Sequence, residues 1–140
     1  MKTIHSTCVN LNGMGILIRG HSGSGKSDLA LQLIDQKATL VADDYCIINV
    51  LKNQIIATCP KSTEGVIEMR GYGIINLPYQ KTTRVHLIRD LLKARDIRRL
   101  TDNPFIRLEG IKLFHMMDDN KIDHATAKTK LHTDTTLRIK

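Results

Sequence analysis

Short apolar runs separated by Gly, Asn, Asp and Pro dominate the first two thirds of this 140-residue chain. Runs of about four to eight residues between turn signals are typical of β-strands. The pair Asn12-Gly13 joins the first two runs and favours a tight turn, which predicts a hairpin. The expected strands cover residues 8–11, 14–19, 39–42, 45–50, 54–58, 66–69, 74–77, 85–92 and 110–117.

One segment has a different period. Leu29, Ala30, Leu33 and Ile34 recur at the spacing of one helix face, which predicts a helix over residues 26–36. A second helix is expected at 122–131, whereas the basic stretch 93–100 fits no single element. Many short strands and few helices indicate an α/β domain with a mixed sheet. The length fits one domain covering residues 1–140.

Composition and charge narrow the class of partner. The formal net charge of +7 favours anionic partners, but no basic run is interleaved with aromatic residues as in a single-strand nucleic-acid groove. The three cysteines are widely spaced and odd in number, which favours a reducing compartment. No apolar run approaches the roughly 20 residues of a membrane span. We therefore expect a cytoplasmic protein with neither a nucleic-acid nor a membrane partner.

The most specific pattern is Gly-x-x-x-x-Gly-Lys-Ser at residues 20–27. Glycines let backbone N–H groups curl around a phosphate, and the following helix points its positive end at the same anion. The lysine can reach the outer phosphates and the serine hydroxyl can ligate Mg²⁺. A chance glycine-rich turn is disfavoured because an apolar strand precedes and an amphipathic helix follows. The expected nucleotide-binding residues are Gly20, Ser22, Gly23, Ser24, Gly25, Lys26 and Ser27.

Two further segments carry acidic residues. Asp43-Asp44 closes a short apolar strand, where an acid commonly holds Mg²⁺ or accepts a proton, although Asp is also common in turns. Glu68 and Arg70 stand two apart, on one face of an extended chain, and could contact a metal and a phosphate. A strand, a glycine bend and an exposed ion pair would give the same pattern. His5 is uninformative by pattern alone.

Taken together, these motifs resemble the catalytic domain of the HPr kinase/phosphorylase family. The phosphate loop at 20–27, Val-Ala-Asp-Asp at 41–44 and Glu-x-Arg-Gly-x-Gly-Ile-Ile at 68–75 stand in the family's order, and the likeness extends over residues 4–92. The resemblance implies a mixed β-sheet domain with a P-loop, of the type shared with phosphoenolpyruvate carboxykinase. It also implies transfer of phosphate from ATP to a serine of an HPr-like carrier, reversed in many members by phosphorolysis.

Carried over by position, the resemblance assigns a role to each residue. Lys26 would bind the phosphates, and Ser27 and Glu68 would hold Mg²⁺. Asp43 would be the base for the acceptor serine and the acid in the reverse step. Asp44 would support Asp43, His5 would assist it, and Arg70 would shape the site.

The chain also departs from the family. Long members have a separate N-terminal domain, for which we expect no room here, and the segment after Leu77 lacks the glycine-rich mobile loop. Phosphorolysis and the usual hexamer are therefore left open, as is a homo-oligomer of another kind. A small-molecule kinase and a non-catalytic ATP-binding regulatory module remain as alternative functions.

Overall fold

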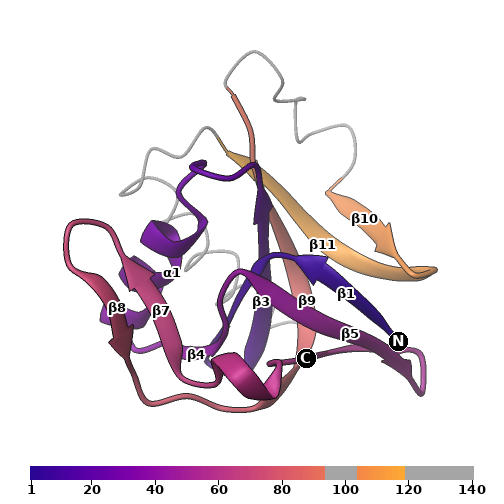
Figure 1. Cartoon of the computed structure of the whole chain (residues 1–140). Helices are drawn as coiled ribbons and strands as arrows, with labels where there is room; N and C mark the ends of the chain where they lie inside the picture. Colours follow the sequence, from indigo (N-terminus) through magenta and orange to yellow (C-terminus); the bar gives the residue numbers. More distant parts are fainter. Residues whose placement is uncertain (94–103, 119–140) are drawn as a thin grey trace.

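The computed structural model describes residues 1–93 and 104–118. Within them the chain forms a large mixed sheet, a two-stranded hairpin and one α-helix, α1 (Figure 1). The elements in chain order are β1 (Lys2–His5), β2 (Thr7–Leu11), β3 (Met14–Gly20), α1 (Lys26–Asp35), β4 (Thr39–Ala42), β5 (Tyr45–Leu51), β6 (Gln54–Thr58), the 3₁₀ turn η1 (Lys61–Thr63), β7 (Val66–Met69), β8 (Gly73–Asn76), β9 (Thr82–Leu91), β10 (Phe105–Leu108) and β11 (Ile111–Asp118).

The long strand β9 organises the sheet. The described strand order is β1-β5-β6-β9-β3-β2-β4, and β11, which also pairs with β10, joins β9 as well. The first part of β9 runs antiparallel to β6, and its later part runs parallel to β3 on one side and to β11 on the other. The carboxyl ends of β3, β9 and β11 therefore lie together, and β3 leads into the phosphate loop from that end of the sheet.

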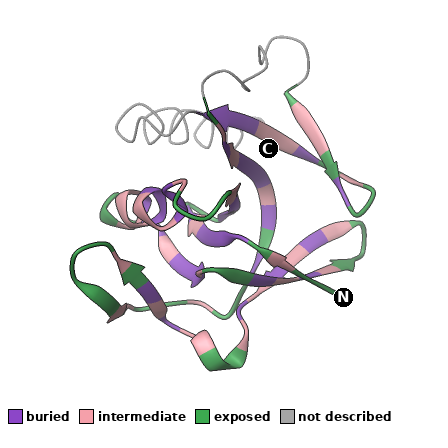
Figure 2. Cartoon of the chain, turned by 45° about the horizontal axis from the view of Figure 1, so that its top comes forward, coloured by how far each residue is buried: buried purple, intermediate pink, exposed green. Residues whose placement is uncertain are grey.

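Two apolar cores cover the two faces of this sheet. On β3, Ile16 and Ile18 pack with the helix residues Leu29 and Leu33, whereas the intervening Leu17 packs in the other core with residues of β5 and β6. This alternation is the two-residue period of a strand buried on both faces. The hairpin β7–β8 lies beside α1 and contributes Ile67 to the helix-side core. Figure 2 shows the buried residues along the central strands and the exposed ones around the tip of this hairpin.

Ion pairs connect the ends of the parallel strands. Arg19 donates two hydrogen bonds of 2.8 Å to Asp90, and His115 Nε2 lies 2.7 Å from the same carboxylate. Burial raises the pKa of Asp90, but the hydrogen bonds from His115 and Arg19 outweigh it and hold that pKa at about 2. A second pair, Arg89 with Asp118 at 3.1 Å, is almost completely buried. Burial lowers the pKa of Arg89 to about 10, against the opposing effect of Asp118.

Most of the predicted elements are confirmed. The mixed α/β class, the helix at 26–36 and the strands between residues 7 and 76 agree with the structure to within one or two residues. Sequence reasoning missed β1 and β10, because both are short and β1 is a largely exposed edge strand without alternating apolar residues. The basic stretch from residue 94 and the helix expected at 122–131 lie outside the described residues. No described helix is long and apolar enough to cross a membrane.

Candidate functional site

The loop between β3 and α1 needs glycine at two positions for different reasons. Gly25 precedes the first residue of α1 with φ 99°, in the left-handed region that residues with a Cβ rarely adopt. A Cβ on Gly20 would lie 2.4 Å from Ser24 Oγ, because the loop folds back over the strand end. Ser24 N donates to the His21 carbonyl over 2.9 Å, which closes a turn inside the loop. The sequence therefore produces a compact curl between the end of β3 and the start of α1.

Lys26 is the charged side chain of this loop. Its Nζ donates to the carbonyl oxygens of Gly20, at 2.9 Å, and of His21, at 3.1 Å. Burial lowers the pKa of Lys26, and the nearby charges of Asp44 and Asp43 oppose that shift. The ammonium group is thus held beside the loop by neutral acceptors rather than by a carboxylate.

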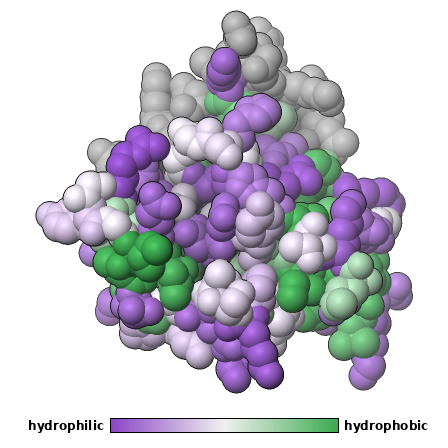
Figure 3. Space-filling model, viewed as in Figure 1, coloured by the Kyte–Doolittle hydropathy of each residue, from purple (hydrophilic) through white to green (hydrophobic). Residues whose placement is uncertain are grey.

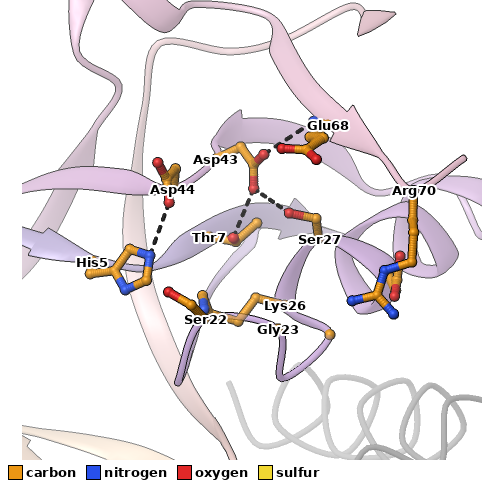
Figure 4. A pocket seen from close by; sticks show the side chains of 12 residues that line it. His5, Thr7, Ser22, Gly23, Lys26, Ser27, Asp43, Asp44, Glu68 and Arg70 are labelled. Carbon is orange, nitrogen blue, oxygen red and sulfur yellow. Dashed lines mark hydrogen bonds and ion pairs between the residues drawn. The ribbon is translucent and has the colours of Figure 1, made fainter. Parts of the chain in front are cut away.

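Asp43 lies at the end of β4 and is bound by three donors from three parts of the chain. Its Oδ1 accepts hydrogen bonds from Ser27 Oγ at 2.7 Å and from Thr7 Oγ1 at 2.9 Å. Its Oδ2 accepts one from the backbone N–H of Glu68 at 3.3 Å. The carboxylate therefore links the start of α1, the strand β2 and the hairpin strand β7 (Figure 4).

Asp44 points away from Asp43 and pairs with a histidine. Its Oδ1 lies 2.9 Å from His5 Nε2, and the side chains of Asp44 and His5 are 65% and 37% exposed. Asp44 has φ 71°, a left-handed conformation that Asp tolerates better than most residues. The backbone is held there because Ser6 N donates to the Asp44 carbonyl over 3.0 Å. The two adjacent acids thus face different directions.

These groups line one open cleft of about 200 Å³. The hairpin supplies Glu68 from β7 and Arg70 from just beyond it, opposite the loop and α1 (Figure 4). Hydrophilic side chains dominate the middle of the face shown in Figure 3, and apolar side chains gather over the β7–β8 hairpin, where Tyr72 and Ile74 are exposed. The cleft is lined by His5, Thr7, Ser22, Gly23, Gly25, Lys26, Ser27, Asp28, Asp43, Asp44, Glu68 and Arg70.

The structure brings together ten of the twelve residues that the sequence singled out, from segments far apart in the chain. Gly20 and Ser24 do not line the cleft; they shape the loop from behind. Two lining residues were missed. Asp28 directly follows the phosphate-loop motif, and Thr7 lies two residues after His5 in a buried strand. The signal for Thr7 was a hydroxyl-bearing residue at the start of a largely apolar strand, two positions after His5.

The donor set suits a hard divalent cation. Ser27, Asp43 and Glu68 present hydroxyl and carboxylate oxygens, the ligand type that Mg²⁺ prefers. Among residues 1–93 and 104–118, no group of three or more His, Cys, Asp and Glu side chains could hold a metal ion by itself. Mg²⁺ commonly uses one or two protein carboxylates together with substrate phosphates.

The fold and the loop joining β3 to α1 define a mixed α/β domain with a phosphate-loop motif. The chain belongs to the HPr serine kinase C-terminal domain family, whose model matches residues 1–100.

Among curated relatives, the HPr kinase/phosphorylase of Clostridium beijerinckii is 35% identical over 86% of this chain. That of Clostridium tetani is 45% identical over 54% of it. The chain spans 35% and 25% of the length of these two proteins. Among solved structures, the HPr(Ser) kinase/phosphatase of Coxiella burnetii matches with a TM-score of 0.83 and 28% identity. That match covers 97% of this chain and 99% of the other.

Proposed function

We propose that this domain transfers the γ-phosphoryl group of ATP to a serine hydroxyl of an HPr-like phosphocarrier protein. One observation carries the proposal: the phosphate loop, the Ser27–Asp43 hydrogen bond and the His5–Asp44 pair line a single cleft. Family membership supports the same reaction class. Such a protein would act in the cytoplasm, where ATP and phosphocarriers are found.

The loop and its neighbours would bind the nucleotide. Backbone N–H groups of Ser22, Gly23 and Gly25 would surround the phosphates, and Lys26 would exchange its two carbonyl acceptors for phosphate oxygens. Ser27 would ligate Mg²⁺, with Glu68 as a further oxygen ligand. Mg²⁺ neutralises charge that develops on the transferring phosphoryl group. Arg70, on the opposite wall, would contact the same group.

The geometry favours a different division of labour between the two acids from the one expected from sequence. Both oxygens of Asp43 already accept hydrogen bonds, one of them from the proposed Mg²⁺ ligand Ser27. We therefore infer that Asp43 orients the cation site. Asp44 is more exposed than Asp43. Among the described residues, only Oδ1 of its carboxylate makes a hydrogen bond, and the partner is His5.

Asp44 is therefore the better candidate for the base that accepts the serine proton. A hydroxyl is a poor nucleophile until a positioned carboxylate can take its proton. His5 would orient Asp44 and stabilise its charge. In the reverse direction, the protonated Asp44 would return the proton to the serine oxygen as inorganic phosphate attacks phosphoserine.

The test is transfer to a carrier protein. The domain is incubated with γ-labelled ATP, Mg²⁺ and an HPr-type carrier, and acid-stable phosphoserine is measured on the carrier. A carrier with the acceptor serine replaced by alanine is the control, and it should remain unlabelled. If ATP binds but the carrier is never labelled, the domain is a regulatory nucleotide-binding module and the kinase proposal is wrong. Addition of phosphate to the labelled carrier then measures phosphorolysis through the release of pyrophosphate.

A further inference from the structure

Thr7 is a buried polar residue next to the cleft. It begins β2, its exposed fraction is 0%, and its hydroxyl lies 2.9 Å from Asp43 Oδ1. A buried hydroxyl costs free energy unless it makes a hydrogen bond, so this contact accounts for a fully buried polar side chain at the start of β2. No other part of the proposed chemistry requires a hydroxyl at this position.

The three donors to Asp43 differ in how firmly they are held. Ser27 follows the phosphate loop, and Glu68 belongs to the separate hairpin β7–β8. Thr7 lies in β2, which is paired with β3 on one side and with β4 on the other, and Thr7 itself is in register with Ile18 of β3. Its side chain is β-branched and has few rotamers. Thr7 is therefore the donor that fixes the position of the Asp43 carboxylate relative to the central sheet.

This contact matters because Asp43 and the cation would bind the same Ser27 hydroxyl, Asp43 through its hydrogen and the cation through its oxygen. While Ser27 donates its hydroxyl hydrogen to Asp43 Oδ1, the lone pairs of Ser27 Oγ remain available to a metal. If the carboxylate rotated, it could turn toward Lys26, which lines the same cleft. Groups that orient a metal ligand through a hydrogen bond are part of the metal site even though they do not touch the ion.

We propose that Thr7 is a positioning residue for the cation site: its buried hydroxyl fixes the Asp43 carboxylate so that Ser27 presents its lone pairs to Mg²⁺. This inference rests on the proposed nucleotide-binding function. It concerns the binding of the cation with the nucleotide and needs no acceptor protein. It can therefore be tested separately from phosphoryl transfer.

The experiment compares Thr7→Val, which keeps the shape and removes the donor, with Thr7→Ser, which keeps the donor. Binding of a fluorescent ATP analogue is titrated with Mg²⁺ and repeated in EDTA, and thermal unfolding controls for the fold. Thr7→Val should weaken Mg²⁺ binding to the nucleotide complex by about ten- to a hundredfold, as for loss of other groups that orient metal ligands, with little change in EDTA. Thr7→Ser should restore most of this loss. Thr7→Ala serves as the donor-free variant if valine impairs folding.

Each contrary result has its own meaning. If the donor-free variants need the same Mg²⁺ concentration as the wild type, or if Thr7→Ser is as weak as Thr7→Val, Thr7 has no positioning role. An equal loss with Mg²⁺ and in EDTA would assign Thr7 to the fold alone and overturn the inference. If the wild type binds no nucleotide under either condition, the proposed function fails and the inference fails with it.

Discussion

Two pairs of aspartates at the ends of strands of the same sheet have different kinds of partner. Asp90 and Asp118, on the parallel strands β9 and β11, are paired with Arg19 and Arg89. Asp43 and Asp44, at the end of β4, accept hydrogen bonds from hydroxyls, a backbone N–H and a histidine, and neither makes an ion pair with Lys or Arg among the described residues.

The difference separates carboxylates that hold strands together from carboxylates that line the cleft and are available to a ligand. A carboxylate that already has a guanidinium partner has little negative charge left for a ligand, and its pair fixes the strand ends to one another. A carboxylate held by neutral donors keeps its charge and stays oriented. The nearest ammonium group, Lys26, is kept apart on two carbonyl oxygens. The cleft therefore retains negative potential for a cation beside a positive group for phosphates.

The largest effect should come from the exposed acid of the cleft. Asp44→Asn should lower transfer to the carrier by about 10²- to 10⁴-fold, because the proton acceptor is lost, while nucleotide affinity stays within about twofold. Initial rates and nucleotide titrations measure the two quantities. Asp35→Asn, an exposed acid at the end of α1, is the matched control and should change neither.

Asp43→Asn should show the reverse pattern, with weaker Mg²⁺-dependent nucleotide binding as its main defect. If it instead abolishes transfer and leaves binding intact, whereas Asp44→Asn retains most of its rate, Asp43 is the base after all.

The buried pair offers the next largest effect, on stability rather than activity. Asp118→Asn leaves the guanidinium of Arg89 buried without a counter-charge and should cost about 3–5 kcal/mol in free energy of unfolding. Urea denaturation measures this. Replacing both residues together, Arg89→Met with Asp118→Leu, should recover most of the loss, since no uncompensated charge remains. A single variant as stable as the wild type would show that the pair does not hold the strands.

The paired acid Asp90 predicts a pH dependence of stability. Its folded pKa of about 2 is below its ordinary value of 3.8, so its contribution is complete above about pH 4 and is lost as pH falls toward 2. The shift corresponds to about 2 kcal/mol. Unfolding free energies measured between pH 5 and 2 should fall more steeply for the wild type than for Asp90→Asn. Parallel curves would place the acid sensitivity elsewhere.

The smallest effect is expected at the histidine. His5→Ala removes the hydrogen bond to Asp44 and should slow transfer about tenfold, the size of one charge-assisted hydrogen bond, with nucleotide affinity unchanged. Tyr45, whose ring centroid lies 5.5 Å from that of His5, provides a comparison, since Tyr45→Phe keeps the ring contact and should keep the rate. Equal losses in both variants would contradict the assignment of the rate loss to the His5–Asp44 hydrogen bond, because Tyr45→Phe leaves that bond in place.

The sequence predicted the parts of the site that depend on local pattern. The loop, the helix after it and the acids at the end of β4 are each encoded by a few consecutive residues, and the structure agrees with their local conformation. It could not reveal the partner of each acid, because a contact such as Thr7 with Asp43 joins residues 36 apart in the chain. The opposite directions of Asp43 and Asp44 depend on a left-handed residue and on a backbone bond from Ser6, neither of which has a sequence signature.

The parallel pairing of β3 with β9 has a consequence for synthesis of the protein. Arg19 and its partner Asp90 are 71 residues apart, so β3, which pairs with β2 on one side, gains its second neighbour β9 only after the phosphate-loop motif has left the ribosome. Contacts of such long range form slowly, and an apolar strand waiting for its partner is open to aggregation. We therefore expect a nascent chain ending before residue 82 to carry every residue of the phosphate loop and yet bind no nucleotide. On this view, the motif that is recognised first in the sequence is among the last parts of the molecule to become functional.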